Sequence, residues 1–170
     1  KALHARLLAI YSSKDRIPGV LARGAWLYNF WQDARNPRGL WRRTTLREYR
    51  KADPEWETVI DMDRLGVDEG ENWVWKGAHC LYPEFARCLV SLSRGGADAV
   101  EIREFDTVNK AFVKDGFFLP VSKGTAVWRD ADTLYIARDF GAGRTQEVVF
   151  QLADRHARDG SKRIPVDVSP

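Results

Sequence analysis

The chain is 170 residues long, carries a formal net charge of +3, and is 44% hydrophobic and 30% charged. This composition is typical of a globular domain and excludes a disordered chain, and no apolar run approaches the roughly 20 residues that a membrane-spanning helix needs. The mild charge gives little support to a nucleic-acid or anionic-membrane partner.

The first residues have the spacing of an amphipathic helix. Leu3, Leu7, Leu8 and Tyr11 recur at helical intervals, which predicts a helix over residues 1–12.

From Gly24 onward the hydrophobic period changes to two, which predicts antiparallel β-strands as far as residue 140. Short turn sequences rich in Gly, Pro and Asp separate the segments, so consecutive strands should pair as a meander. The segments with strand character are residues 25–33, 39–46, 56–63, 72–80, 86–94, 98–106, 110–116, 125–131 and 132–140.

These strand segments form a repeat. Residues 72–116 hold four strands, and residues 125–140 restart the first two, with Val-Trp-Lys at 74–76 recurring as Val-Trp-Arg at 127–129. Residues 25–63 resemble the last three strands of an earlier unit. Units of four antiparallel strands that repeat every roughly 40 to 50 residues are typical of β-propeller blades. We therefore predict an all-β fold, a partial β-propeller of consecutive four-stranded blades with a short N-terminal helix.

The repeat length limits how much of a ring this chain can form. Propellers close with about four to eight blades, and 170 residues supply about three or four. A partial ring leaves strand edges and the apolar flank of its terminal blade exposed, so we expect self-association through these open edges. Tryptophans at matching places in successive units should then pack between blades.

Two cysteines, Cys80 and Cys88, lie in short strands around a turn at Pro83 and Glu84. They could form a bridge across the hairpin, but we expect two free thiols because disulfides are rare in intracellular proteins. One pair of cysteines is too few ligands for zinc, and His79 points to the opposite face of the strand from Cys80. We therefore predict no metal site here.

Residues that could carry out catalysis lack recognisable companions. His4 falls on the predicted helix, His79 in a strand and His156 in a polar tail. Ser91 and Ser93 lie in a strand, and the G-x-S-x-G elbow of an α/β-hydrolase nucleophile does not occur in this sequence.

Two further motifs also favour ordinary structural roles. Asp61 and Asp63 share one face of a predicted strand, as two hydrolase acids would, but a solvated strand end explains them better. Residues 141–143, Gly-Ala-Gly, lack the lysine and the strand-to-helix context of a phosphate-binding loop. We therefore expect no catalytic, cofactor-binding or metal-binding residue in this chain.

The most basic stretch is residues 36–50, which contain five arginines and two large aromatic residues. Arginines interleaved with aromatics suit a nucleic-acid contact, because rings stack on bases while guanidinium groups pair with phosphates. The same stretch also has the character of half a hairpin. Pro37 and Gly39 favour a turn, and residues 40–46 are rich in strand formers.

Strand geometry gives these arginines a simpler role. Trp41 alternates with Arg42, and Arg43 with Thr44, so we expect one face to pack and the other to meet solvent or a neighbouring unit. The arginines then serve as surface charges, as contacts to another domain, or as partners of nearby acids. The candidate acids are Glu48, Glu55 and Glu57.

Four strings of sequence carry a family resemblance: FWQDARNPRGLWRRTTLREYRKADPEWETVIDMDRL, ENWVWKGAHCL, RCLVSLSRGGADAVEIREFD and KAFVKDGFFLP. They resemble the N-terminal propeller of bacterial members of the prolyl oligopeptidase family of serine peptidases, and the similarity runs from about Asp15 to Gly141. In that family a β-propeller caps an α/β-hydrolase domain and limits access to short peptides. The resemblance also implies a helical segment before the propeller.

The resemblance implies that a peptidase catalytic domain in the parent protein is the partner of this chain. After Gln146 the sequence matches the family only loosely. We therefore expect a helix at 1–14, about three blades of an incomplete ring at 15–145, and a divergent tail or partial strand at 146–170. Because no signal peptide is recognisable, we expect the bacterial cytoplasm, with the periplasm open if a segment precedes Lys1.

Two functions remain open from the sequence alone. The chain is either the propeller portion of a prolyl oligopeptidase-like enzyme, which performs no chemistry itself, or a stand-alone propeller-like module that binds protein or nucleic acid through the basic strand. A reading frame that continues into a G-x-S-x-G elbow with a downstream Asp and His favours the first. A frame that stops near Pro170 favours the second.

Overall fold

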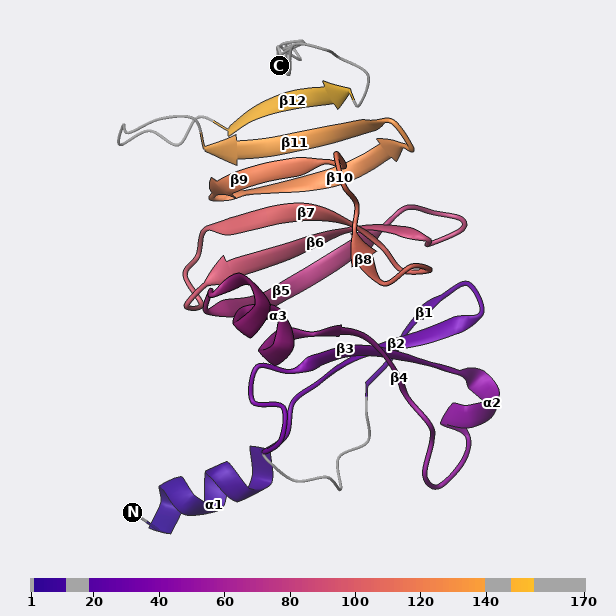
Figure 1. Cartoon of the computed structure of the whole chain (residues 1–170), viewed down its shortest axis with the longest axis vertical. Coiled ribbons are helices and arrows are strands. Elements are labelled where there is room, and N and C mark those ends of the chain that lie inside the picture. Colours follow the sequence, from indigo (N-terminus) through magenta and orange to yellow (C-terminus); the bar gives the residue numbers. More distant parts are fainter. Residues whose placement is uncertain (1, 12–18, 140–147, 155–170) are drawn as a thin grey trace. The chain divides into compact units, whose positions relative to one another are not determined.

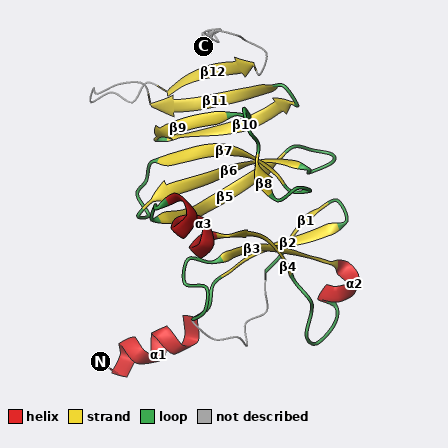
Figure 2. Ribbon diagram, in the orientation of Figure 1, coloured by secondary structure: helices red, strands yellow, loops and turns green. Residues whose placement is uncertain are grey.

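The computed structural model describes residues 2–11, 19–139 and 148–154. Within these described residues there are three sheets of antiparallel strands and three short helices (Figures 1 and 2), which confirms the predicted all-β class. The chain divides into two compact units, residues 1–75 and 76–170. Across the part of the chain that the structure describes, no helix combines the length and apolarity needed to cross a membrane.

The N-terminal unit holds a four-stranded sheet in the order β1-β2-β3-β4. Its elements are α1 (Ala2–Tyr11), β1 (Leu21–Arg23), β2 (Trp26–Trp31), β3 (Leu40–Thr45), α2 (Leu46–Tyr49), β4 (Glu57–Asp61) and α3 (Met62–Glu69). The predicted N-terminal helix is confirmed over its described residues. Strand β1 was not predicted, because three residues are too few to show an alternating pattern.

The turn between β2 and β3 forms as the sequence predicts. The Asp33 carboxylate accepts hydrogen bonds from the backbone N–H groups of Arg35 and Asn36, both at 2.9 Å, which closes an Asx turn. Gly39 has a φ of 100°. A Cβ there would lie 2.4 Å from Cζ of Phe30, so both the conformation and the space require glycine.

The prediction that Asp61 and Asp63 share a strand face is wrong, because β4 ends at Asp61 and α3 begins at once. The Asp61 side chain accepts a hydrogen bond from the Arg64 N–H at 3.0 Å and so caps α3. Asp63 lies in the first turn of α3, and its carboxylate accepts from the Arg38 N–H at 3.1 Å. Both carboxylates therefore accept backbone hydrogen bonds that hold the chain at the start of α3.

The remaining strands form a five-stranded and a three-stranded sheet. The first has the order β5-β6-β7-β8, with β9 also pairing with β7, and the second has the order β10-β11-β12. Their bounds are β5 (Trp73–Cys80), β6 (Arg87–Arg94), β7 (Val100–Asp106), β8 (Ala111–Phe112), β9 (Phe118–Ser122), β10 (Gly124–Asp130), β11 (Thr133–Asp139) and β12 (Val148–Asp154). β12 lies in the segment predicted to be a divergent tail or partial strand.

Of the strand predicted at 110–116, only β8 (Ala111–Phe112) forms, and β9 (Phe118–Ser122) was not predicted. Glu104, in β7, contacts the loop between them. Its buried carboxylate accepts from Arg87 Nη1 at 2.6 Å and from the Phe117 N–H at 2.8 Å. The second bond ties the end of the loop to β7.

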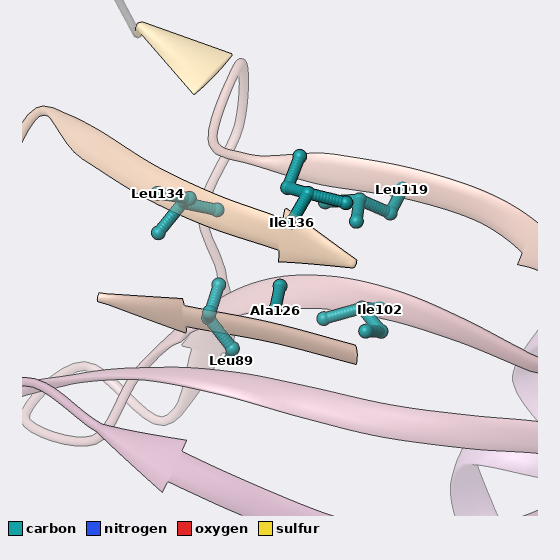
Figure 3. Packing of buried hydrophobic residues seen from close by; sticks show 6 residues of the cluster. All are labelled: Leu89, Ile102, Leu119, Ala126, Leu134 and Ile136. Atoms are coloured by element: carbon teal, nitrogen blue, oxygen red, sulfur yellow. The ribbon is translucent and has the colours of Figure 1, made fainter. Parts of the chain in front are cut away.

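A hydrophobic cluster joins the two sheets of the C-terminal unit (Figure 3). Trp128 lies at its edge, with its ring edge-on to Phe117 at a centroid distance of 5.8 Å and its Nε1–H bonded to the His79 carbonyl at 2.9 Å. Trp75, its counterpart in the repeat, stacks on Phe30 of β2 at 5.3 Å. The contacts confirm that the repeated tryptophans serve in packing. The cluster consists of Leu89, Ile102, Leu119, Ala126, Leu134 and Ile136.

The expectation of free thiols is wrong in this structure, since Cys80 and Cys88 form a disulfide. The Leu81 N–H donates to the Arg87 carbonyl at 2.8 Å, which aligns the two cysteines across the mouth of the hairpin. Thr107, directly after β7, contacts the same loop, with its hydroxyl 3.1 Å from the Ala86 carbonyl. The hairpin end is therefore held by a covalent bond and by hydrogen bonds.

Removing the disulfide should destabilise the chain. The bond closes a loop between residues eight apart, so chain entropy predicts that Cys80→Ala lowers the free energy of unfolding by about 2 to 3 kcal/mol. Urea unfolding without reductant measures this, and adding reductant should affect the parent sequence but not the variant. Two thiols that titrate rapidly in the native, unreduced protein would contradict the pairing.

The loop over Glu104 should be sensitive to a single methyl group. A Cβ at Gly116 would lie 2.8 Å from Cβ of Val113 and 2.9 Å from Oε2 of Glu104. We expect Gly116→Ala to lower the free energy of unfolding by about 1 to 3 kcal/mol, the usual cost of overpacking. The control is Gly19→Ala, where the added Cβ meets nothing within 4 Å. Equal urea midpoints for the two variants would refute this tight packing.

Candidate functional site

The basic stretch lies in the sheet β1-β2-β3-β4, where its residues divide between two faces. Register pairs Tyr28 with Arg43, and Asn29 with Arg42. Because side chains alternate along a strand, Trp41 shares a face with Arg43, and Arg42 faces the opposite way. We call these the Trp41 face (Trp26, Tyr28, Phe30, Trp41, Arg43 and Glu57) and the Arg42 face (Asn29, Trp31, Arg42, Trp56 and Thr58).

On the Trp41 face, Arg43 is buried within a complete set of partners. Its Nε lies 2.6 Å from Oε2 of Glu57, and its Nη1 lies 3.2 Å from the Tyr28 hydroxyl. Its guanidinium also stacks over the Trp26 ring at 4.3 Å. Burial opposes the charged form, but the bonds to Glu57 and Tyr28 outweigh it and raise the Arg43 pKa. This arginine is a structural part of the sheet.

The rest of the Trp41 face is a continuous aromatic layer. Tyr28 and Trp41 lie 5.0 Å apart between ring centroids, and Trp41 and Trp75 lie 5.2 Å apart. Arg23 covers the layer at one end, with its guanidinium 5.2 Å from the Tyr28 ring, and burial lowers its pKa. Trp75, in β5, extends this layer, in which Tyr28 and Trp41 are buried and Trp26, Phe30 and Trp75 are partly buried.

On the Arg42 face, the Arg42 guanidinium lies between two indole rings. Its Cζ is 4.4 Å from the centroid of Trp31 and 4.2 Å from that of Trp56. Its Nε donates to Oδ1 of Asn29 at 3.0 Å, and the Asn29 amide nitrogen donates to the Gly19 carbonyl at 2.7 Å. Cation–π contacts of this kind contribute from about 0.5 kcal/mol when exposed to about 2 kcal/mol when desolvated.

The charge of Arg42 is less well compensated than that of Arg43. Desolvation lowers the Arg42 pKa to about 10, and the nearby charge of Asp33 only partly offsets this. The Asp33 carboxylate forms no ion pair with Arg42 in the described ranges; its oxygens accept from Trp31 Nε1 and from Asn36. Arg42 stays protonated at neutral pH, because that pKa is still well above it.

These contacts correct the prediction of surface charges for Arg42 and Arg43, whereas Arg38, Arg47 and Arg50 are exposed, as predicted. Arg43 and Trp41 are both buried, and on the other face Arg42 is half-buried and Thr44 is buried. Both faces therefore pack, and the guanidinium planes of Arg42 and Arg43 are already covered by indole rings. The geometry gives no support to base stacking or phosphate pairing by these two residues.

Of the acids named as partners for the arginines, the expectation for Glu57 is confirmed by its bond to Arg43. Glu48 instead bonds Lys51 at 2.6 Å, with Arg47 more distant at 3.9 Å. Glu55 contributes its backbone carbonyl, which accepts from the Thr44 hydroxyl at 2.6 Å.

The residues screened for catalysis lie apart. His4 is exposed on α1, His79 is exposed in β5, and His156 lies outside the described residues. Ser91 and Ser93 are both in β6, as predicted, and the Ser93 hydroxyl is buried without a hydrogen-bond partner in the described segments. Among residues 2–11, 19–139 and 148–154, no group of His, Cys, Asp and Glu is arranged to hold a metal ion.

Sequence reasoning located the basic stretch but missed the feature that distinguishes Arg42. Trp31 and Trp56 are 25 residues apart in the sequence and come together only through the pairing of β2, β3 and β4. The sequence signal that could have indicated these contacts is the presence of two tryptophans on either side of an arginine-rich strand.

The chain matches the family model described as the N-terminal β-propeller domain of prolyl oligopeptidase over residues 1–154. This match extends past the region of the resemblance noted above and includes β12, so the sequence between Gln146 and Asp154 still belongs to the family pattern.

Two curated relatives carry the name of peptidases. The chain is 44% identical over 154 residues to the uncharacterized peptidase y4nA of Sinorhizobium fredii. The aligned residues make up 90% of this chain and 21% of that protein. It is 41% identical over 107 residues to the uncharacterized peptidase RP174 of Rickettsia prowazekii. Here the aligned residues make up 63% of this chain and 15% of that protein. The chain thus spans about a fifth or less of the length of these relatives.

A solved structure shows the same arrangement. The post-proline cleaving enzyme from Rickettsia typhi matches with a TM-score of 0.83 and 28% identity, covering 96% of this chain and 26% of that one. The antiparallel sheets, the packing of the repeated tryptophans and these matches agree, and the chain belongs to the family of prolyl oligopeptidase N-terminal β-propeller domains.

Proposed function

We propose that this chain supplies the first blades of a propeller that limits the access of peptides to a serine-peptidase domain of the same protein. The observation that carries the proposal is the family match over residues 1–154. The substrates we propose are short peptides that contain proline, in keeping with the post-proline cleaving enzyme whose structure the chain resembles. The nucleophile and its base would come from the α/β-hydrolase part of the protein.

The positions of the candidate nucleophiles support a non-catalytic role for this chain. Ser91 and Ser93 sit in the middle and near the end of a regular strand, β6, where both neighbouring strands are antiparallel members of a sheet. A hydrolase nucleophile instead needs a sharp turn that exposes its hydroxyl beside backbone N–H donors for the oxyanion. The buried Ser93 hydroxyl is not accessible to a peptide carbonyl.

The rigid construction of the sheets supports a gating role. The hairpin between β5 and β6 is closed by the Cys80–Cys88 bond, and Glu104 anchors the loop between β8 and β9. A structure that limits access to an active site by the size of the peptide must keep its shape when larger peptides contact it. These two anchors tie the loops of the five-stranded sheet to its strands.

The chain alone should not cleave a chromogenic peptide that contains proline, whereas the full-length protein should. The measurement is release of the chromophore by equal concentrations of the two proteins, with Ser91→Ala and Ser93→Ala variants of the chain as controls. Turnover by the isolated chain would refute the non-catalytic role, and its loss in either serine variant would identify the nucleophile.

Gating makes a separate claim about the full-length protein. It should cleave the short peptide but leave the same cleavage sequence intact within a long, unfolded polypeptide, because the propeller admits only short chains. Cleavage of both substrates with similar kcat/KM would contradict gating while leaving the peptidase assignment in place.

A further inference from the structure

We propose that the edge of the five-stranded sheet formed by β8 and β9 is built to prevent pairing with a strand from a second copy of this chain, and that Pro120 is central to this protection. The inference goes beyond the proposed function, because it concerns which surfaces of the protein stay apart and does not depend on peptide cleavage.

The edge formed by β8 and β9 is a surface at which another strand could add. Both strands pair with β7 and with no other strand among the described residues. The backbone N–H and C=O groups on the outer side of an edge strand can pair with another chain. Residues 117–122, Phe-Phe-Leu-Pro-Val-Ser, carry no charge, and Phe118 and Val121 are 59% and 46% exposed. An uncharged, apolar segment at a sheet edge is typical of sequences that aggregate.

A loop interrupts this edge between its two strands. The Val113 N–H donates to the Glu104 carbonyl at 3.0 Å, and the Glu104 N–H donates to the Phe117 carbonyl at 2.8 Å. Both ends of the loop are therefore bonded to one residue of β7, and residues 114–116 lie outside the ladder. β8 is only two residues long as a result. An incoming strand therefore meets no continuous edge along β8.

β9 is irregular at Pro120. Val100 pairs with Ser122, and Ile102 pairs with Leu119, so β9 has one residue more than β7 between these two pairs. The extra residue forms a β-bulge that contains Pro120, and a bulge bends and twists an edge strand. Proline also has no N–H to donate to a neighbouring strand. β9 therefore lacks both the regular spacing and one of the donors that an added strand needs.

Charged residues flank the uncharged segment. Lys114 and Asp115 precede it and Lys123 follows it, and all three are exposed. Lys123 lies 3.8 Å from Asp98, which is also exposed, so its ammonium group stays in contact with water. A strand added to β9 would remove part of that water, which opposes pairing. The self-association expected from open blade edges should therefore not involve β9.

The test compares Pro120→Val with the parent sequence in the full-length protein, by sedimentation velocity over a range of protein concentrations. Valine restores the N–H and favours strands, so β9 becomes available to a second copy. We expect the concentration at which half of the protein is associated to fall at least about tenfold, as a few added hydrogen bonds would cause. Hydrogen exchange of the β9 amides should also slow in the associated protein.

Three further substitutions make the comparison specific. Pro120→Lys restores the N–H but places a charge on the edge, so it should behave like the parent sequence. Pro37→Val makes the same exchange in the exposed β2–β3 turn and should change nothing. Lys123→Val removes one flanking charge and should shift association in the same direction as Pro120→Val, but less. If Pro120→Val does not fold, Lys123→Val decides the question.

Unchanged association in Pro120→Val and Lys123→Val would overturn the proposal. Equal association of Pro120→Val and Pro120→Lys would overturn it too, because loss of the proline ring would then be the cause and not strand pairing. Association of Pro120→Val without slower exchange in β9 would place the contact elsewhere, with the same consequence for the proposal.

Discussion

Large side chains on both faces of one sheet are the constraint on which this structure depends. Trp31 and Trp41 are 9% and 3% exposed, yet they point to opposite sides of the sheet β1-β2-β3-β4. A sheet that carries large aromatic side chains on both faces is stable only when something packs against each of them. Stacked blades satisfy this requirement repeatedly, since each sheet buries a face of the next. In the C-terminal unit, a cluster of aliphatic side chains likewise buries the facing sides of two sheets.

The same constraint explains why arginines occur inside the first sheet. A guanidinium can lie flat between indole rings and still donate hydrogen bonds from its edge, which a lysine ammonium cannot do. Arg43 uses its edge on Glu57 and Tyr28, and the gain in hydrogen bonds keeps its pKa high despite burial. Arg42 uses one donor on Asn29 and has a lowered pKa. The adjacent arginines therefore differ in the number of hydrogen bonds that their guanidinium groups donate within the described residues.

The fold class, the repeat and the turn at Gly39 could be predicted because each leaves a local signal in the sequence. Alternation shows a strand, and a glycine before a strand shows a turn. What could not be predicted depends on contacts between distant residues. The early end of β8 and the unpredicted strand β9 are accompanied by the bond of Glu104 to Phe117, which no local pattern records.

The candidate site shows the same division. Composition identified the basic stretch, and alternation placed Arg42 and Arg43 on opposite faces. Their burial was missed, because a charged side chain is expected at the surface, and the sequence does not show that tryptophans from other strands cover the guanidinium groups. The disulfide was missed because the choice between thiols and a bridge was made from the expected compartment and not from hairpin geometry.

The most direct test of the account is an experimental structure of the full-length protein. We expect Trp31 and Trp41 to be buried on opposite faces of the sheet β1-β2-β3-β4, with the Arg42 guanidinium against the Trp31 and Trp56 rings. A structure in which either Trp31 or Trp41 faces solvent would contradict it.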